Sequence, residues 1–457
     1  MNTITTASKK RISPFFIIVF GYLIAISLGT LLLALPASNQ NGQWLNPIDA
    51  LFTAASAVCI TGLTTVNVAT TFSILGQIVI LIMIQIGGLG IMGLAAAVFL
   101  AIRKKLTLTN KIVIQQTVGE MPSYQIASYL RYMLIATAVI ETTGAVILTP
   151  CFIKIFGPIG IFKAVFMSVS AFCNAGIDVL SYQPEFGSLM SFSDNVCVLL
   201  SISFLIILGG IGFWVIMDVL KARKINRWML QSKIVVTVTL VLLASGTIIF
   251  LIAEWNNPHT LGKMPIYQKI LNAFFMAVSP RTAGFNNVDL KNSTEFSKLV
   301  TMILMFIGGS PVSTSGGIKT TTAAVLLLAI ISGFRSKDRI IFGKRYINER
   351  ITLKAVAVAG AFLILTIIFT MALLATEKGQ NTEYYNLETL LFESLSALCT
   401  VGLSLGVTPF LSIGGKLVIT LAMFVGRLGP LTIGLLFLKN IKSEDKLRYP
   451  EAMVMIG

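Results

Sequence analysis

Long apolar stretches and shorter apolar segments alternate along this chain of 457 residues. Eight of the stretches are long enough to cross a bilayer, for which about 20 apolar residues suffice. They form four pairs, and one shorter segment lies inside each pair. The first members cover 14–35, 128–150, 234–254 and 352–376, and the second members cover 73–100, 195–220, 297–331 and 414–438. This pattern predicts an all-α integral membrane protein with eight transmembrane helices.

The four shorter segments share one signature, a phenylalanine ten residues before a glycine. They are Phe52…Gly62, Phe166…Gly176, Phe274…Gly284 and Phe392…Gly402. Successive glycines lie 114, 108 and 118 residues apart, so an internal repeat covers nearly the whole chain. An apolar segment too short to span, placed between two spans, is typical of a re-entrant segment. We therefore expect four tandem repeats, each a first span (M1), a re-entrant pore helix and a second span (M2), around one central pore.

The repeats divide the chain into four predicted parts. Their bounds are 1–105, 106–225, 226–345 and 346–457, and the last part ends in a C-terminal tail.

The residues that lead to each glycine are candidate cation ligands. A helix C-terminus carries about half a negative charge, so four such ends directed at one axis would attract a cation. Glycine accepts positive φ and keeps the backbone close to an ion. No carboxylate occurs at these positions, which favours backbone oxygens and a monovalent cation. The candidates are Cys59, Ile60, Thr61, Gly62, Cys173, Asn174, Ala175, Gly176, Thr282, Ala283, Gly284, Thr400, Val401 and Gly402. The alternative is that the glycines only allow close helix packing, but four in register favour the ion site.

A second repeated motif lies in the second spans, as GGLG (87–90), GGIG (209–212), GGSP (308–311) and GRLG (426–429). Arg427 replaces a small residue in the last copy. An arginine inside a span costs about 2.5–3.5 kcal/mol on insertion scales, so it should face water or the protein interior. It is either part of a gate or a buried partner for a carbonyl or for Glu141.

The third second span is interrupted by a polar, glycine-rich run that should break a helix. Such a break at membrane depth should line a cavity, so the run is a candidate gate, with a static kink as the alternative. Lys319, just after it, is either a second gate charge or a residue that extends towards the cytoplasmic interface. The run is Gly308, Gly309, Ser310, Pro311, Val312, Ser313, Thr314, Ser315, Gly316 and Gly317.

Charge adds an orientation to this picture. The net charge is +16, yet only 12% of residues are charged, against about 25% in soluble domains. Basic clusters fall at one end of the spans, near 9–11, 103–111, 221–227, 335–350 and 439–448. The positive-inside rule then places both termini in the cytoplasm of a multi-pass protein of the cell membrane. Membrane topology explains this charge better than nucleic-acid binding does.

Enzyme chemistry finds little support in the sequence. The five cysteines lie in or beside apolar segments without metal-site or disulfide spacing. The single histidine, His259, falls in a predicted external loop. No nucleophile–base pair and no nucleotide-binding loop is visible, so we expect neither catalysis nor a covalent cofactor.

At these residues the chain resembles the KtrB-type membrane subunits of the Trk/Ktr/HKT superfamily of potassium and sodium translocators. The matching stretches include SAFCNAGI, SPRTAGFN, GGSPVSTSGGIKTTT, FVGRLGPLT and the ending RYPEAMVMIG. The resemblance implies potassium uptake, often with sodium dependence, through a selectivity filter at the four glycines. It also implies a gating loop at 308–317 constrained by Arg427, a homodimer with a contact at Gly457, and a cytoplasmic RCK-type ring of nucleotide-binding subunits.

Two mechanisms remain open from the sequence. A channel-like translocator fits four repeats that run in the same direction. A cation-coupled secondary transporter, a K⁺/Na⁺ or K⁺/H⁺ symporter, would also use broken helices and repeats. Intramembrane acids that could carry coupled protons are few, and Glu141 is the best candidate.

Overall fold

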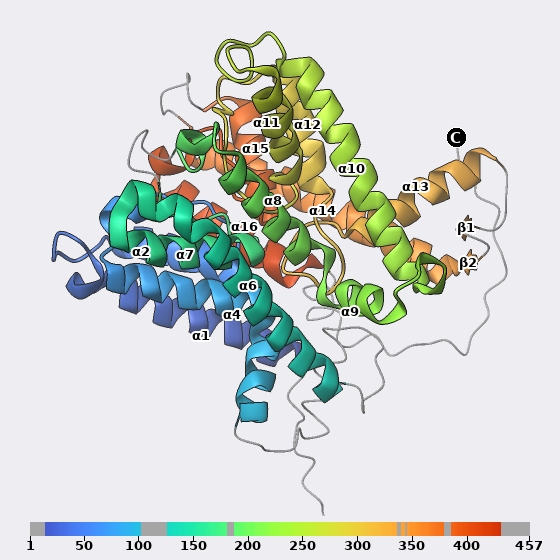
Figure 1. Cartoon of the computed structure of the whole chain (residues 1–457), viewed down its shortest axis with the longest axis horizontal. Coiled ribbons are helices and arrows are strands. Elements are labelled where there is room, and N and C mark those ends of the chain that lie inside the picture. The colour runs from blue at the N-terminus through green and yellow to red at the C-terminus, as the bar shows by residue number, and fades with distance from the viewer. Residues whose placement is uncertain are drawn as a thin grey trace, which may run out of the picture.

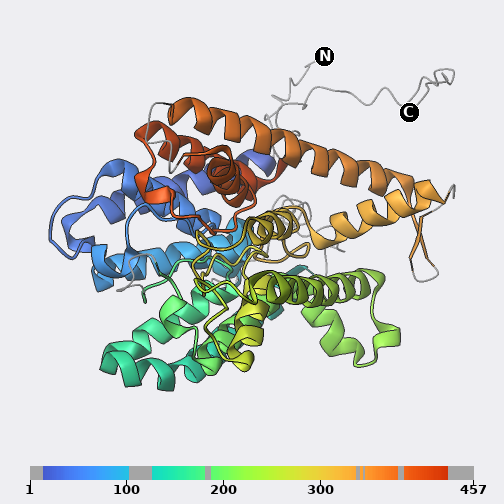
Figure 2. The same ribbon diagram turned by 90° about the horizontal axis from the view of Figure 1, so that it is seen from above.

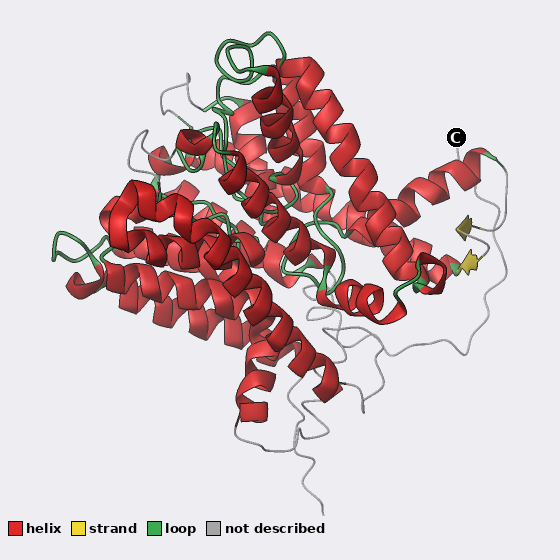
Figure 3. Ribbon diagram, in the orientation of Figure 1, coloured by secondary structure: helices red, strands yellow, loops and turns green. Residues whose placement is uncertain are grey.

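The computed structural model describes residues 14–101, 126–180, 187–335, 340–342, 345–378 and 385–430. In these ranges the chain is almost entirely helical (Figure 3). The exception is a small antiparallel hairpin of β1 (Ile340–Phe342) and β2 (Arg345–Ile347). Gly457, the ending RYPEAMVMIG and the basic clusters near 9–11, 103–111 and 439–448 lie outside the described residues.

Four long helices coincide with the predicted first spans. They are α1 (Pro14–Ala34), α6 (Ile126–Phe156), α10 (Leu230–Glu254) and α14 (Glu349–Thr376). Among the described residues, four helical segments are long and apolar enough to cross a membrane, and one bent pair can add a fifth. The chain therefore has several membrane-spanning helices, and the full set of eight spans stays a prediction.

Four shorter helices occupy the predicted re-entrant segments. They are α2 (Pro47–Cys59), α7 (Gly160–Phe172), α11 (Ile266–Val278) and α15 (Leu387–Leu398). Asn46 and Asn386 cap α2 and α15, since each side-chain oxygen accepts a hydrogen bond from a first-turn N–H. All four helices end a few residues before the repeated glycine.

The second spans are interrupted where the apolar pattern suggests continuous helices. Their helices are α4 (Ile74–Ala101), α8 (Val196–Ile211), α9 (Phe213–Ala222), α12 (Glu295–Phe306), α13 (Thr320–Phe334) and α16 (Ile413–Leu428). Instead of one span over 195–220, α8 and α9 meet at Gly212 with a bend of 92°. Gly90, Gly212 and Gly429 share φ of 72–92° and ψ of 141–151°. Because such backbone angles are readily adopted only by glycine, the last glycine of the motif sets each break.

The remaining described elements are short connections. They are α3 (Val68–Thr71), η1 (Pro36–Ser38), η2 (Gly157–Ile159), η3 (Met190–Phe192), η4 (Ile225–Arg227) and η5 (Thr408–Phe410).

The helices group in chain order into four units, each with one long helix, one short helix and one second-span segment. Unit 1 is α1–α4, unit 2 is α6–α9, unit 3 is α10–α13 and unit 4 is α14–α16 (Figure 1). Viewed from above, the units follow one another around a centre where loops gather (Figure 2). Helix α13, the hairpin and the start of α14 extend away from this centre.

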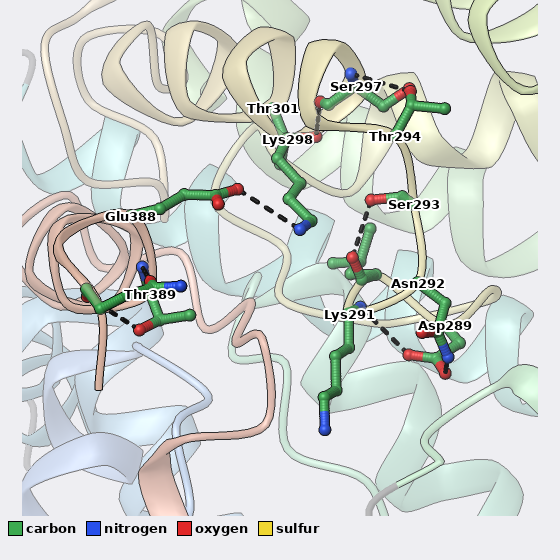
Figure 4. A network of polar contacts seen from close by, with 12 residues as sticks. Asp289, Lys291, Asn292, Ser293, Thr294, Ser297, Lys298, Thr301, Glu388 and Thr389 are labelled. Atoms are coloured by element: carbon green, nitrogen blue, oxygen red, sulfur yellow. Dashed lines mark hydrogen bonds and ion pairs between the residues drawn. The ribbon is translucent and has the colours of Figure 1, made fainter. Parts of the chain in front are cut away.

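Two ion pairs join neighbouring units at corresponding places. Lys298 of α12 lies 3.4 Å from Glu388 in the first turn of α15 (Figure 4). Lys416 of α16 lies 2.8 Å from Asp49 in the first turn of α2. The second pair connects unit 4 back to unit 1, so the order of units closes on itself.

Buried acids anchor the long helices of units 3 and 4. Glu254, the last residue of α10, accepts hydrogen bonds from the backbone N–H of Thr294 at 2.9 Å and from its hydroxyl at 2.7 Å. Glu377, just after α14, accepts from the hydroxyl of Ser412 at 2.6 Å. Thr294 and Ser412 are the N-caps of α12 and α16, so each acid fixes the start of the following helix.

Candidate functional site

Each short helix is followed by the same backbone turn. The residue two positions before the repeated glycine has a left-handed φ, which non-glycine residues rarely adopt. These residues are Ile60 (φ 56°), Asn174 (56°), Thr282 (65°) and Thr400 (49°). The glycines also have positive φ, at Gly62 (97°), Gly176 (69°), Gly284 (77°) and Gly402 (95°). Four copies of one unusual conformation make the turn a candidate functional element.

A serine near the end of each short helix holds the turn. In units 1 and 4, the hydroxyls of Ser56 and Ser396 accept the N–H of Gly62 and Gly402 at 3.0 and 3.1 Å. In units 2 and 3, the corresponding serines instead donate to the carbonyl of the residue just after the glycine. These bonds are Ser170 to Ile177 and Ser279 to Phe285, both at 2.5 Å. We did not single out these serines from the sequence, although one occurs five or six residues before every glycine.

The four turns meet in a closed ring. A Cβ atom placed on each glycine would come too close to the carbonyl oxygen just before the glycine of another unit. The distance would be 2.7 Å from Gly62 to Ala175, 2.8 Å from Gly176 to Ala283 and 2.5 Å from Gly284 to Val401. Gly402 faces Thr61 in the same way, which returns to unit 1. The ring therefore needs glycine at all four positions and brings four backbone carbonyls together.

A cavity of about 470 Å³ lies over this ring, and all four glycines line it. Its wall also carries the carboxylate residues Asp178 and Asp289 and the hydroxyl residues Ser404 and Thr408. Lys291 also lines the cavity, so the two carboxylates leave the wall a small excess of negative charge, which attracts cations.

The run 308–317 forms a compact loop between α12 and α13. Its base is closed by Gly308 N–H donating to the Ile318 carbonyl at 2.9 Å and Ile318 N–H donating to Phe306 at 3.2 Å. Its far side bonds to unit 2, where the Gly210 carbonyl accepts from Ser310 N–H at 2.9 Å. Most of the loop is buried against the ring-bearing turns. The predicted helix break is thus real, and several of its backbone polar groups are hydrogen-bonded inside the protein.

Arg427 reaches this loop from the last turn of α16. One guanidinium nitrogen donates to the Thr314 carbonyl at 2.7 Å, and the other donates to the Gly87 carbonyl of α4. Lys319 donates to the Ser315 carbonyl at 2.5 Å. Of the partners considered from the sequence, the carbonyls are therefore the ones that Arg427 contacts.

Glu141 contacts different groups. One carboxylate oxygen accepts from the amide of Gln85 at 3.3 Å, and the other lies 3.7 Å from the Sγ of Cys173. The acid therefore sits behind the turn of unit 2.

Comparison with known proteins decides the family. The chain matches the family described as TrkH, cation transport protein, over residues 6–449. It is 39% identical to the potassium/sodium uptake protein NtpJ of Enterococcus hirae, over 98% of both chains. It is 38% identical to the Ktr system potassium uptake protein B of Bacillus subtilis, over 98% of this chain and 97% of the relative. The chain belongs to the TrkH family of cation transport proteins. The resemblance to KtrB-type subunits seen in the sequence is thereby confirmed.

A solved structure supports the fold of this TrkH-family chain independently. The potassium transporter TrkH of Vibrio parahaemolyticus superposes with a TM-score of 0.72, covering 94% of this chain and 86% of that one, at 18% sequence identity. The relatives are named as transport proteins, in line with the expectation that this chain is not an enzyme.

Besides the four serines, two further residues of this TrkH-family chain were missed by the sequence analysis. In unit 3 the fully buried phenylalanine is Phe275, not Phe274 of the repeated signature. The reason is that Ser279 lies five residues before Gly284, whereas the serine lies six residues before the glycine in the other units. Glu393 of α15 is fully buried and accepts a hydrogen bond from Thr408, yet it was not weighed among the intramembrane acids.

Proposed function

We propose that this chain is a channel-like uptake translocator that conducts potassium ions down their electrochemical gradient. The observation that carries the proposal is the closed ring of four glycine turns, each glycine against the carbonyl of another unit. Rings of backbone carbonyls select ions by replacing the hydration shell. The names of the relatives indicate which ion is transported, since they describe potassium uptake and, for one of them, potassium and sodium uptake.

The proposal includes the arrangement of the chain in the membrane. Each unit is one M1–pore helix–M2 repeat, and the four surround a single pore in the cell membrane. The candidate ligands before the four glycines form the filter, with potassium as the ion bound there. Described basic residues gather on the side of α9 and the hairpin, at Lys221, Arg223, Lys224, Arg227, Arg345 and Arg350. This asymmetry supports cytoplasmic termini, with the cavity over the ring facing outwards.

The loop 308–317 with Lys319 and Arg427 is the proposed gate. The loop is held by hydrogen bonds to Gly210 of unit 2 and to Arg427 of unit 4, and Arg427 in turn bonds to Gly87 of unit 1. A partly buried guanidinium near the ion path also opposes a passing cation. Loop displacement would therefore remove both a steric and an electrostatic barrier.

Partners belong to the same proposal. Two copies of the chain form a homodimer, in which Gly457 contributes a contact, and a cytoplasmic ring of RCK-type nucleotide-binding subunits regulates the loop. The relatives named as parts of a Ktr system support a multi-subunit assembly. Sodium acts as an activator in this scheme.

A coupled symporter is the second candidate, and Glu141 favours it. The carboxylate lies beside Cys173, the residue before Asn174 in the turn of unit 2. A membrane acid so close to the ring is a reasonable proton carrier.

Ion accumulation in proteoliposomes that contain only this chain separates the two candidates. At −100 mV inside, one charge gains about 2.3 kcal/mol, which corresponds to about 50-fold accumulation of potassium by a channel. A symporter that carries a second positive charge without a gradient of its own would reach about 2,500-fold. Accumulation that stops near 50-fold and ignores an imposed pH or sodium gradient supports the channel. Accumulation that exceeds this limit refutes it.

A further inference from the structure

The side chain of Asn174 joins the ring to the loop. Asn174 lies two residues before Gly176, and its side chain is completely buried. With the amide oriented so that both ends are satisfied, the nitrogen donates to the carbonyls of Ala171 at 3.0 Å and Ile206 at 3.2 Å. The oxygen then accepts the hydroxyl of Ser315 in the loop at 2.6 Å. The nitrogen is fixed inside unit 2, so only the oxygen depends on the loop.

The neighbours of Ser315 in the loop press on the same turns. The hydroxyl of Thr314 donates to the carbonyl of Phe172, the last residue of α7, at 3.4 Å. A Cβ on Gly316 would collide with the hydroxyl of Thr400 and lie 2.8 Å from the carbonyl of Cys399. Residues 314–316 therefore touch the chain immediately before the ring in both unit 2 and unit 4.

The other units offer no equivalent of Asn174. The matching residues are Ile60, Thr282 and Thr400, and the hydroxyls of the two threonines are buried without a hydrogen-bond partner in the described part of the chain. The hydrogen bond to Ser315 is thus the one side-chain bond found between this position and the loop within the described ranges.

We propose that the Asn174–Ser315 hydrogen bond couples the loop to the ring, so that loop displacement changes which cation is selected as well as how fast it passes. This inference rests on the proposed function. When Ser315 leaves, the amide oxygen of Asn174 loses its donor in a site closed to bulk water. A buried acceptor without a donor is unfavourable, so the turn of unit 2 rearranges or the oxygen turns to the ion path. By thermodynamic linkage, docking of the loop then changes the free energy of cation binding in the ring, and cation binding changes the free energy of loop docking by the same amount.

The test compares potassium and sodium flux at matched amounts of reconstituted protein. We expect Ser315→Ala and Asn174→Leu each to lower the potassium-to-sodium flux ratio about tenfold, the factor equivalent to 1.4 kcal/mol. The double variant should lose no more than Asn174→Leu alone, because that variant already removes the bond to Ser315 together with the two bonds inside unit 2. After deletion of 310–315, Asn174→Leu should have little further effect on the ratio. Ser203→Ala serves as the control, since it removes a buried hydroxyl of α8 that has no partner among the described residues.

Additive losses in the double variant would overturn the coupling, and so would an undiminished effect of Asn174→Leu in the loop deletion. If Asn174→Leu does not assemble, Ser315→Ala alone still decides, because an unchanged flux ratio would contradict the inference. Failure of the proposed function looks different, since the unaltered chain would then conduct neither cation or would accumulate potassium beyond about 50-fold at −100 mV. A chain that conducts and selects potassium, but whose ratio ignores the loop, refutes the coupling only.

Discussion

Replacing Gly62 by alanine tests the ring most directly. Gly62 has φ of 97°, and a side chain at such an angle costs about 1–3 kcal/mol. The added Cβ would also lie 2.7 Å from the carbonyl oxygen of Ala175, which is 0.7 Å short of the 3.4 Å where ordinary contact begins (3.4 − 2.7). The carbonyl has to move by several tenths of an ångström. Carbonyl positions on that scale decide how well a ring replaces the water around an ion.

Gly406→Ala is the matched control. Its φ of 90° gives nearly the same backbone strain, but a Cβ there would meet nothing within 4 Å. We expect both variants to lower the amount of assembled protein to a similar extent. Only Gly62→Ala should lower the potassium-to-sodium flux ratio, by about tenfold, equivalent to 1.4 kcal/mol. Gly284→Ser should behave like Gly62→Ala, because its Cβ would lie 2.5 Å from the Val401 carbonyl.

The assay is the initial rate of potassium and sodium uptake into proteoliposomes at equal protein content. Equal ratios for Gly62→Ala and the native chain would show that the carbonyls do not select the ion. Equal losses in Gly62→Ala and Gly406→Ala would show that backbone strain alone, rather than the carbonyl contact, is responsible.

Three further predictions concern the gate, the closure of the ring and the partners. Deleting 310–315 should raise cation flux and make it less dependent on cytoplasmic subunits. Arg427→Ala should have the same effect, because the Thr314 carbonyl loses its hydrogen-bond donor. Flux at the native level in an assembled deletion variant would rule out the gate. Lys416→Met should lower the free energy of unfolding by about 1–3 kcal/mol, since it leaves the largely buried Asp49 without its cation. The measurement is thermal unfolding in detergent, and an unchanged unfolding midpoint would contradict a stabilising role for this ion pair. Purification from native membranes should yield the chain with a soluble nucleotide-binding companion and as a dimer, and recovery of a lone monomer would weaken both parts of that proposal.

The sequence predicted the repeated elements well because their signals are local. Short apolar segments that end before Gly62 and its three counterparts became short helices followed by glycine turns. The polar run 308–317 became a loop, since its serines and glycines cannot extend a helix between α12 and α13.

The bends and the order of contacts were harder to predict. The runs around Gly90 and Gly212 are uniformly apolar, so hydrophobicity alone does not distinguish a straight span from one bent at a single residue. The partner of each glycine in the ring depends on how distant units pack, and no pattern near Gly402 points to Thr61. The membrane cost of Arg427 predicted only that it faces water or the protein interior, and its place at the loop was implied by the family resemblance. Its bond to Gly87 of unit 1 depends on the closed arrangement.

The backbone of the ring repeats in all four units, whereas the side chains around it differ from unit to unit, and this difference has a functional consequence. The backbone of the four turns repeats closely, so the carbonyls form a nearly fourfold site although the chain is one polypeptide. The side chains behind the turns differ, with an apolar residue at Ile60, an amide at Asn174 and hydroxyls at Thr282 and Thr400. Four identical subunits would have to repeat every contact. A single chain with four unequal units can keep the proposed ion site regular in its backbone while one unit supplies a loop and another receives it.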